Sequence, residues 1–135
     1  MKLLIDTNII LEILLAQQNS NSAQQLLSRT KEFKFFISDF SLNSIGVLLY
    51  RKKRHEAFTF FLSDIVDSIG ITVIGLTSNE LKKLNAIALQ QNLDFDDSYQ
   101  YSLSEIHDLT LVSFDADFDK TELGRKTPSQ VLSLL

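Results

Sequence analysis

Three aspartates that lie far apart in the sequence are the residues of this chain best suited to chemistry. Asp6 follows the aliphatic run Leu3–Ile5, Asp97 lies in the segment LDFDDSYQY, and Asp115 lies in SFDADFD. Burying Asp6 between that run and the apolar segment Ile9–Leu15 is costly unless something compensates the charge. Hard cations such as Mg²⁺ and Mn²⁺ take carboxylate ligands and cancel the repulsion between them. The sequence therefore predicts a divalent-metal site.

Other kinds of catalytic site find little support in the sequence. The chain has no cysteine, which excludes a zinc–thiolate site and a cysteine nucleophile. It shows no P-loop, no glycine-rich dinucleotide loop and no Ser-His-Asp order. A phosphatase of the haloacid dehalogenase type would need Asp-x-Asp after the first strand, and a receiver domain would need paired acids there. The sequence Asp6-Thr7-Asn8 fits neither.

Each acid also has a structural interpretation when it is taken singly. Asp97 could cap a helix, and Asp115 and Asp117 could serve as turn residues around a short helical segment. Asp6 is harder to explain in this way, because Thr7 could cap the following helix without a charge. Taken together, these acids are better explained by a metal-binding site than by separate caps and turns.

The elements that must position these acids alternate between strands and helices. We expect strands at residues 2–5, 33–37, 71–76 and 109–113, and helices at 8–16, 20–30, 40–50, 55–68 and 97–107, with a further helix after a capping box at 77–80. The tail around Val131 and Leu132 is a candidate for a short fifth strand. This order predicts a three-layer α/β/α fold, with a mostly parallel sheet of four or five strands, in a single domain over residues 1–135. Sites in such folds lie at the carboxyl ends of the strands.

Charge is unevenly distributed along the chain. The net charge is −4, yet residues 94–119 contain eight acids and no Lys or Arg, whereas Arg51, Lys52, Lys53 and Arg54 form a basic run. The acidic segment suits cations and the basic run suits polyanions. Both could also be solvated surface, and for the basic run alone this is the favoured interpretation. There is no secretion-signal pattern and no apolar run long enough to span a membrane, so we expect a cytoplasmic protein.

Three segments in order, LLIDTNIILEILL, LDFDDSYQYSLSE and LTLVSFDADF, resemble the PIN-domain nuclease family. The likeness is to its small single-domain (VapC-like) ribonuclease toxins of toxin–antitoxin pairs. It covers essentially the whole chain and implies a PIN-like fold. It also implies a set of site residues: Asp6, Asp97 and Asp115 as catalytic and metal-binding acids, Asp117 as an auxiliary ligand, and Asn8 and Ser113 as polar neighbours.

One position departs from the pattern of that family. The family usually carries an acid in the helix after the second strand, and Ser44 stands at that position here. Asp39 is five residues earlier, which turns it about 140° around the helix, so we expect it to point elsewhere and cap the helix. Glu12 would contribute only if its face of the first helix turned toward the site.

The resemblance implies a Mg²⁺- or Mn²⁺-dependent endoribonuclease, with RNA as substrate, a small antitoxin as partner and a homodimeric state. The basic run 51–54 would then contact the RNA backbone. An alternative is a non-catalytic PIN-like module that binds RNA or protein, because Ser44 replaces an acid. A third hypothesis is an interaction protein whose apolar helices pair with another chain.

Overall fold

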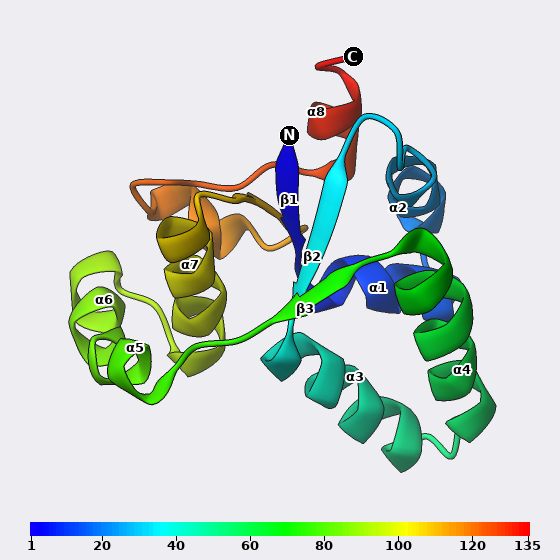
Figure 1. The fold of residues 1–135 in the computed structure, drawn as a ribbon, viewed down its shortest axis with the longest axis horizontal. Helices are drawn as coiled ribbons and strands as arrows, with labels where there is room; N and C mark the ends of the chain where they lie inside the picture. Colours follow the sequence, from blue (N-terminus) through cyan, green and yellow to red (C-terminus); the bar gives the residue numbers. More distant parts are fainter.

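The protein is built on a four-stranded parallel sheet, seen in a computed structural model that describes all of residues 1–135 (Figure 1). The strands are β1 (Lys2–Ile5), β2 (Lys34–Ser38), β3 (Thr72–Ile74) and β4 (Thr110–Val112). Their spatial order is β3-β2-β1-β4, and every neighbouring pair is parallel. The predicted α/β fold is confirmed.

Helices cover both faces of this sheet, as Figure 1 shows. On one side lie α1 (Thr7–Leu14), α2 (Ser20–Leu27), α3 (Asp39–Arg51) and α4 (His55–Phe60), which continues into the π-helix η1 (Phe61–Asp67). On the other side lie α5 (Ser78–Lys82), α6 (Leu84–Gln91) and α7 (Phe95–His107). The 3₁₀ helix η2 (Ala116–Lys120) follows β4, and α8 (Pro128–Leu132) packs against α2.

The alternation of side chains along β1 divides the apolar core between the two faces. Leu3 and Ile5 point into the cluster beneath α1 to α4, whereas Leu4 points into the cluster beneath α6 and α7. All three are completely buried. Because both faces of a parallel sheet are covered, its strands are continuous apolar runs, which is the pattern that identified β1 in the sequence.

The predicted fifth strand is wrong, because Val131 and Leu132 belong to helix α8. Thr127 and Gln130 form a capping box, and Pro128 occupies the first turn, a combination that starts a helix. The chain beside β4 instead makes a single parallel bridge, between Val112 and Lys126.

Two predicted helices are interrupted in the structure. The capping box at Thr77 and Glu80 is present, but the helix that it starts breaks at Lys83 into α5 and α6. The helix predicted over 55–68 is α-helical only to Phe60 and then widens to π-helical turns. No helix in the structure is both long enough and apolar enough to cross a bilayer.

The strand order sets the position of the site. After β1 the chain adds β2 and β3 on one side, then returns to place β4 on the other side of β1. The crevice at such a switch point, beyond the carboxyl ends of the two strands, is where open α/β sheets bind ligands. Here it lies beyond Ile5 and Val112, which are paired in the sheet.

Candidate functional site

Asp6 lies at the carboxyl end of β1, where its backbone N–H donates to the Val112 carbonyl at 3.0 Å and extends the β1–β4 ladder. The residue is only 7% exposed, so its charge is held almost out of water. The protein compensates this burial with hydrogen bonds, and the bond from Thr7 N makes Asp6 the N-cap of α1, a role that the sequence suggested for Thr7. The carboxylate accepts from Thr7 N (2.8 Å), Gln100 Nε2 (2.9 Å), Ser113 Oγ (2.6 Å) and Asn8 Nδ2 (3.4 Å).

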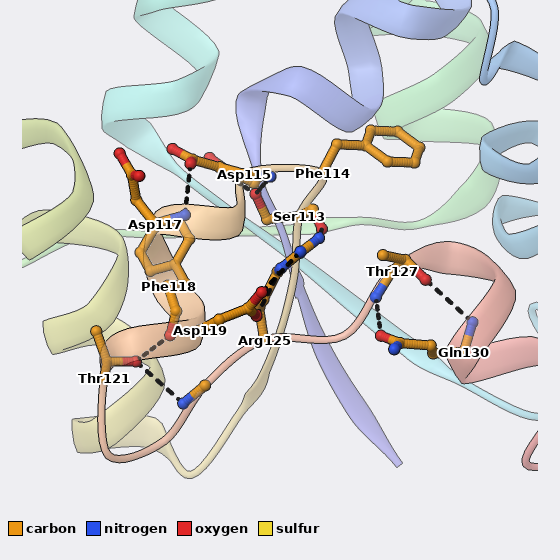
Figure 2. A network of polar contacts seen from close by, with 12 residues as sticks. Ser113, Phe114, Asp115, Asp117, Phe118, Asp119, Thr121, Arg125, Thr127 and Gln130 are labelled. Carbon is orange, nitrogen blue, oxygen red and sulfur yellow. Dashed lines mark hydrogen bonds and ion pairs between the residues drawn. The ribbon is translucent and has the colours of Figure 1, made fainter.

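Asp115 starts the short helix η2 just beyond β4. Its Oδ1 accepts from Asp117 N at 2.9 Å, and its own N–H donates to Ser113 Oγ at 2.9 Å. Figure 2 shows the Asp115 and Asp117 carboxylates on one side of η2, away from Asp119. Asp119 is held by both Nε and Nη2 of Arg125, each at 3.0 Å, and this pairing lowers the pKa of the Asp119 carboxyl. Asp119 is thereby kept out of the site.

Asp97 lies in the first turn of α7, but it does not cap that helix. The cap is Asp94, whose Oδ1 accepts from Asp97 N at 3.0 Å, so a capping role for Asp97 is wrong. No protein donor reaches the Asp97 carboxylate. Burial raises its pKa from the ordinary 3.8 to about 7, and the negative charges of neighbouring carboxylates add to the shift. Those neighbours are Asp94, Asp115, Asp6 and Asp117.

Asp6, which follows β1, Asp115, which follows β4, and Asp97 at the start of α7 meet in one hollow of about 230 Å³. Its lining consists of Asp6, Thr7, Asn8, Leu11, Phe40, Ser44, Asp96, Asp97, Gln100 and Asp115. No Lys, Arg or His lines it, so the carboxylates face one another without a cation. Asp97, Asp115 and Asp117 each place a carboxylate oxygen within 4.8 Å of the others. Asp6 shares the hollow, but it is outside this group of three.

The residues at this site fit a divalent cation. All the charged ligands are oxygens, which is the donor set that Mg²⁺ and Mn²⁺ prefer. Three carboxylates converge, and Asp97 carries a raised pKa with no hydrogen-bond donor to compensate its charge. A cation between the carboxylates would remove that repulsion. The resemblance implied Asp6, Asp97 and Asp115 as ligands and Asp117 as an auxiliary ligand, whereas the three carboxylates within 4.8 Å of one another are those of Asp97, Asp115 and Asp117.

The two predicted polar neighbours, Asn8 and Ser113, lie between Asp6 and the start of η2. Ser113 Oγ donates to Asp6 and accepts from Asn8 Nδ2 at 3.1 Å. Asn8 Oδ1 in turn accepts from the backbone N–H of Phe114 at 3.1 Å. These bonds tie the end of β1 to the segment that carries Asp115.

Ser44 lines the hollow, so the helix position at which the family usually has an acid does face the site. Glu12 does not, because it accepts a hydrogen bond from Asn19 N at 2.8 Å and holds the turn between α1 and α2. Asp39 is also absent from the lining. Its expected capping role is wrong, since the side chain that caps α3 is Ser38.

Asp39 is held elsewhere by an aromatic residue. Its Oδ1 accepts from the Tyr99 hydroxyl at 2.7 Å and from Phe40 N at 2.7 Å. Tyr99 is buried in the core beneath α7, as its apolar spacing indicates. Asp39 therefore provides no replacement for the missing acid.

Sequence reasoning missed Gln100, which is only 2% exposed and lies beside Asp6. Its Nε2 donates to Asp6 and, at 2.8 Å, to Ser41 Oγ, which also accepts from Thr7 Oγ1 at 2.8 Å. A signal was available, because Gln100 follows Asp97 by three residues and so shares its helix face.

The basic run is not part of the hollow. Of its four residues, Arg51 alone lines the neighbouring shallow groove along α3, which has a volume of about 350 Å³. Phe40 and Ser44 line both the groove and the acidic hollow. The groove thus runs from the carboxylates along α3 toward Arg51.

The raised pKa of Asp97 predicts a pH-dependent stability for the metal-free protein. Between the ordinary pKa of 3.8 and about 7, the folded state keeps a proton that the unfolded chain has released. Raising the pH through this range therefore lowers the free energy of unfolding, and above about 7 the contribution is constant. We expect the Tm difference between wild type and Asp97→Asn to widen from pH 4 to pH 8 in EDTA. A Tm difference that does not change with pH would contradict a raised pKa for Asp97.

Comparison with protein families gives a match to the PIN domain over residues 3–123. A comparison with curated proteins finds no match.

Solved structures with the same fold share little sequence with this chain. PAE2754 from Pyrobaculum aerophilum is 18% identical, with a TM-score of 0.70 over 99% of this chain and 97% of the other. A toxin–antitoxin complex from Klebsiella pneumoniae is 18% identical, with a TM-score of 0.68 over 93% and 96%. VapC20 from Mycobacterium tuberculosis, described as a sarcin–ricin loop cleaving toxin, is 15% identical, with a TM-score of 0.72 over 87% and 92%.

Proposed function

The chain belongs to the PIN domain family, and from that premise we propose that it is a divalent-metal-dependent endoribonuclease and the toxin of a toxin–antitoxin pair. One observation carries the proposal. Three carboxylates, from Asp97, Asp115 and Asp117, lie within 4.8 Å of one another, and the hollow that Asp97 and Asp115 line together with Asp6 has no Lys, Arg or His in its lining.

Asp97, Asp115 and Asp117 would hold Mg²⁺ or Mn²⁺, and Asp6, which lines the same hollow, would be the fourth carboxylate ligand. A divalent ion at such a site activates water and stabilises the leaving oxygen of a phosphodiester. The chain's own contribution is positioning. Ser113 fixes Asp6 and the backbone of Asp115 through a single hydroxyl, at 2.6 Å and 2.9 Å.

RNA would reach the acids along the groove on α3. Phe40 lines both the groove and the hollow and offers an aromatic face on which a base can stack. Arg51 lines the far part of the groove and would contact a phosphate. Lys52, Lys53 and Arg54 lie beyond it and would contribute mainly to long-range attraction.

Reversing the charge of single residues in the basic run should distinguish a direct contact with RNA from long-range electrostatic attraction of RNA. We expect Arg51→Glu to raise the KM for RNA more than Lys53→Glu, because only Arg51 lines the groove. Loss of one phosphate contact should also reduce the salt slope of RNA binding by about one. Binding measured by fluorescence anisotropy between 50 and 300 mM salt checks this. Equal effects from the two variants would remove Arg51 from the RNA path.

A non-catalytic role is the second candidate, and Ser44 is the observation that favours it. A serine lines the hollow where the family usually supplies a charge, so metal affinity would be lower than with four acids. On this alternative the protein binds RNA, and EDTA has no effect on the binding.

The proposed partner is a small antitoxin protein, and the proposed state is a cytoplasmic homodimer of single-domain chains. The likeness to a toxin–antitoxin complex from Klebsiella pneumoniae supports the antitoxin. A short open reading frame beside the gene would support it further.

The nuclease proposal is tested by incubating purified protein with labelled RNA in Mn²⁺, in Mg²⁺ and in EDTA. We expect cleavage with at least one of the metals and none in EDTA. Asp115→Asn, purified in the same way, controls for contaminating ribonucleases and should leave the RNA intact. Cleavage that persists in EDTA, or equal cleavage by the variant, would contradict the proposal. RNA retained without turnover would favour the non-catalytic alternative.

A further inference from the structure

Gln100 is a polar side chain that is almost completely buried beside the site. It is 2% exposed, and its Oε1 is buried with no hydrogen-bond partner. A buried carbonyl without a donor costs stability. A methionine has nearly the same length and would leave no such atom, so packing alone does not account for an amide at this position.

The Nε2 atom of the Gln100 side chain explains why an amide occupies this position. Nε2 donates to Asp6 Oδ1 at 2.9 Å and to Ser41 Oγ at 2.8 Å, so both of its hydrogens are used. The orientation of the amide follows from Asp6. A carboxylate oxygen only accepts hydrogen bonds, and the reversed amide would place Oε1 against Oδ1.

Gln100 also connects two parts of the site that come from different elements. It lies one helical turn after Asp97 on α7, whereas Asp6 ends β1 and Ser41 belongs to α3. Its hydrogen bonds therefore fix the distance between the helix that carries Asp97 and the strand that carries Asp6. Ser41 is anchored in turn by the hydroxyl of Thr7 at 2.8 Å.

We propose that Gln100 is a positioning residue, which holds the Asp6 carboxylate in place opposite Asp97 and Asp115 through its side-chain N–H groups. Partners that orient metal ligands in this way typically contribute 10–100-fold to metal affinity. The role matters more in a site where Ser44 supplies no charge, because the remaining acids must then be well placed. The inference rests on the proposed metal-dependent function.

The test is the affinity for Mn²⁺, measured by calorimetry on wild type, Gln100→Met and Ser102→Ala. Ser102 is a matched control because it is on the same helix, is 1% exposed and has an unpartnered hydroxyl, yet it does not line the hollow. We expect Gln100→Met to bind Mn²⁺ at least about tenfold more weakly, with a metal-free Tm close to that of wild type. Ser102→Ala should bind Mn²⁺ as wild type does. Wild-type affinity in Gln100→Met would overturn the proposal.

A double-mutant cycle shows whether Gln100 acts through Asp6. In an Asp6→Asn background, Gln100→Met should weaken Mn²⁺ binding by less than about threefold, since the group that it positions has been changed. A full tenfold loss in that background would overturn the inference. If Gln100→Met does not fold, Ser41→Ala keeps the amide but removes one of its two acceptors. Weaker Mn²⁺ binding by that variant supports the inference, and unchanged binding overturns it.

The result for wild type distinguishes a failure of this inference from a failure of the proposed function. If wild type binds no Mn²⁺, the metal-dependent function fails. If wild type and Gln100→Met bind Mn²⁺ equally, only the role of Gln100 fails.

Discussion

Asp97→Asn is expected to abolish RNA cleavage and, at the same time, to stabilise the metal-free protein at pH 8. Cleavage should fall at least about 100-fold, because even the partners that merely orient metal ligands are worth 10–100-fold. The gain in stability follows from the environment of Asp97. Its ionised form is disfavoured by burial and by the charges of four neighbouring aspartates, as its pKa of about 7 indicates, and asparagine removes that charge.

The two effects of Asp97→Asn are measured separately. Cleavage is followed with labelled RNA in Mn²⁺, and stability by thermal unfolding at pH 8 in EDTA. Adding Mn²⁺ should raise the Tm of wild type but not that of the variant, because a ligand that binds only the folded state stabilises it. Asp67→Asn serves as a control, since Asp67 is an exposed acid on η1, outside the hollow. Cleavage at the wild-type rate by Asp97→Asn would contradict the assignment.

Ser44→Glu is expected to strengthen metal binding and to raise the rate of cleavage. Ser44 is partly exposed on α3 and lines the hollow together with Asp6, Asp97 and Asp115. A glutamate there adds a carboxylate at the position where the family usually has an acid. We expect Mn²⁺ to bind at least about tenfold more tightly, which corresponds to ~1.4 kcal/mol. In EDTA the variant should be less stable than wild type, because another negative charge joins the repelling carboxylates.

Asn43→Glu is the matched control for Ser44→Glu. It adds the same charge to the same helix, but Asn43 is turned about 100° away and lies outside the acidic hollow. Because Asn43 lines the groove proposed for RNA, the comparison rests on calorimetric titration with Mn²⁺, which should separate the two variants. Equal gains from both would show a general effect of charge rather than a completed ligand set. Tighter Mn²⁺ binding by Ser44→Glu without faster cleavage would mean that Ser44 does not limit the chemistry.

Much of the fold could be predicted because its signals are local. The aliphatic run at Leu3–Ile5 identified β1, and Thr77 with Glu80 marked the start of α5. The helix at Val131 also has a local signal, since Thr127 and Gln130 form a capping box of the same kind. The π-helical turns from Phe61 to Asp67 have no comparable signal in the sequence, because apolar periodicity hardly distinguishes them from α-helix.

The candidate site was predictable to the level of its segments, but its internal arrangement was not. The end of β1, the start of α7 and the segment after β4 could be placed together from the alternation of strands and helices, because sites in such folds lie at the carboxyl ends of the strands. The hydrogen bonds that occupy both oxygens of Asp6 depend on Gln100 and Ser113, which are 94 and 107 residues away in the sequence. Asp117 was expected as an auxiliary ligand, and the tight turn at η2 is what places its carboxylate within 4.8 Å of those of Asp97 and Asp115.

Crystallography with Mn²⁺ shows directly whether Asp97, Asp115 and Asp117 hold a divalent cation. Crystals of the wild-type protein soaked in Mn²⁺ should give an anomalous difference peak bounded by the carboxylates of these three residues. Crystals of Asp97→Asn, soaked under the same conditions, should show a weaker peak or none at that position. No peak in wild type, or a peak located elsewhere on the protein, would contradict the account.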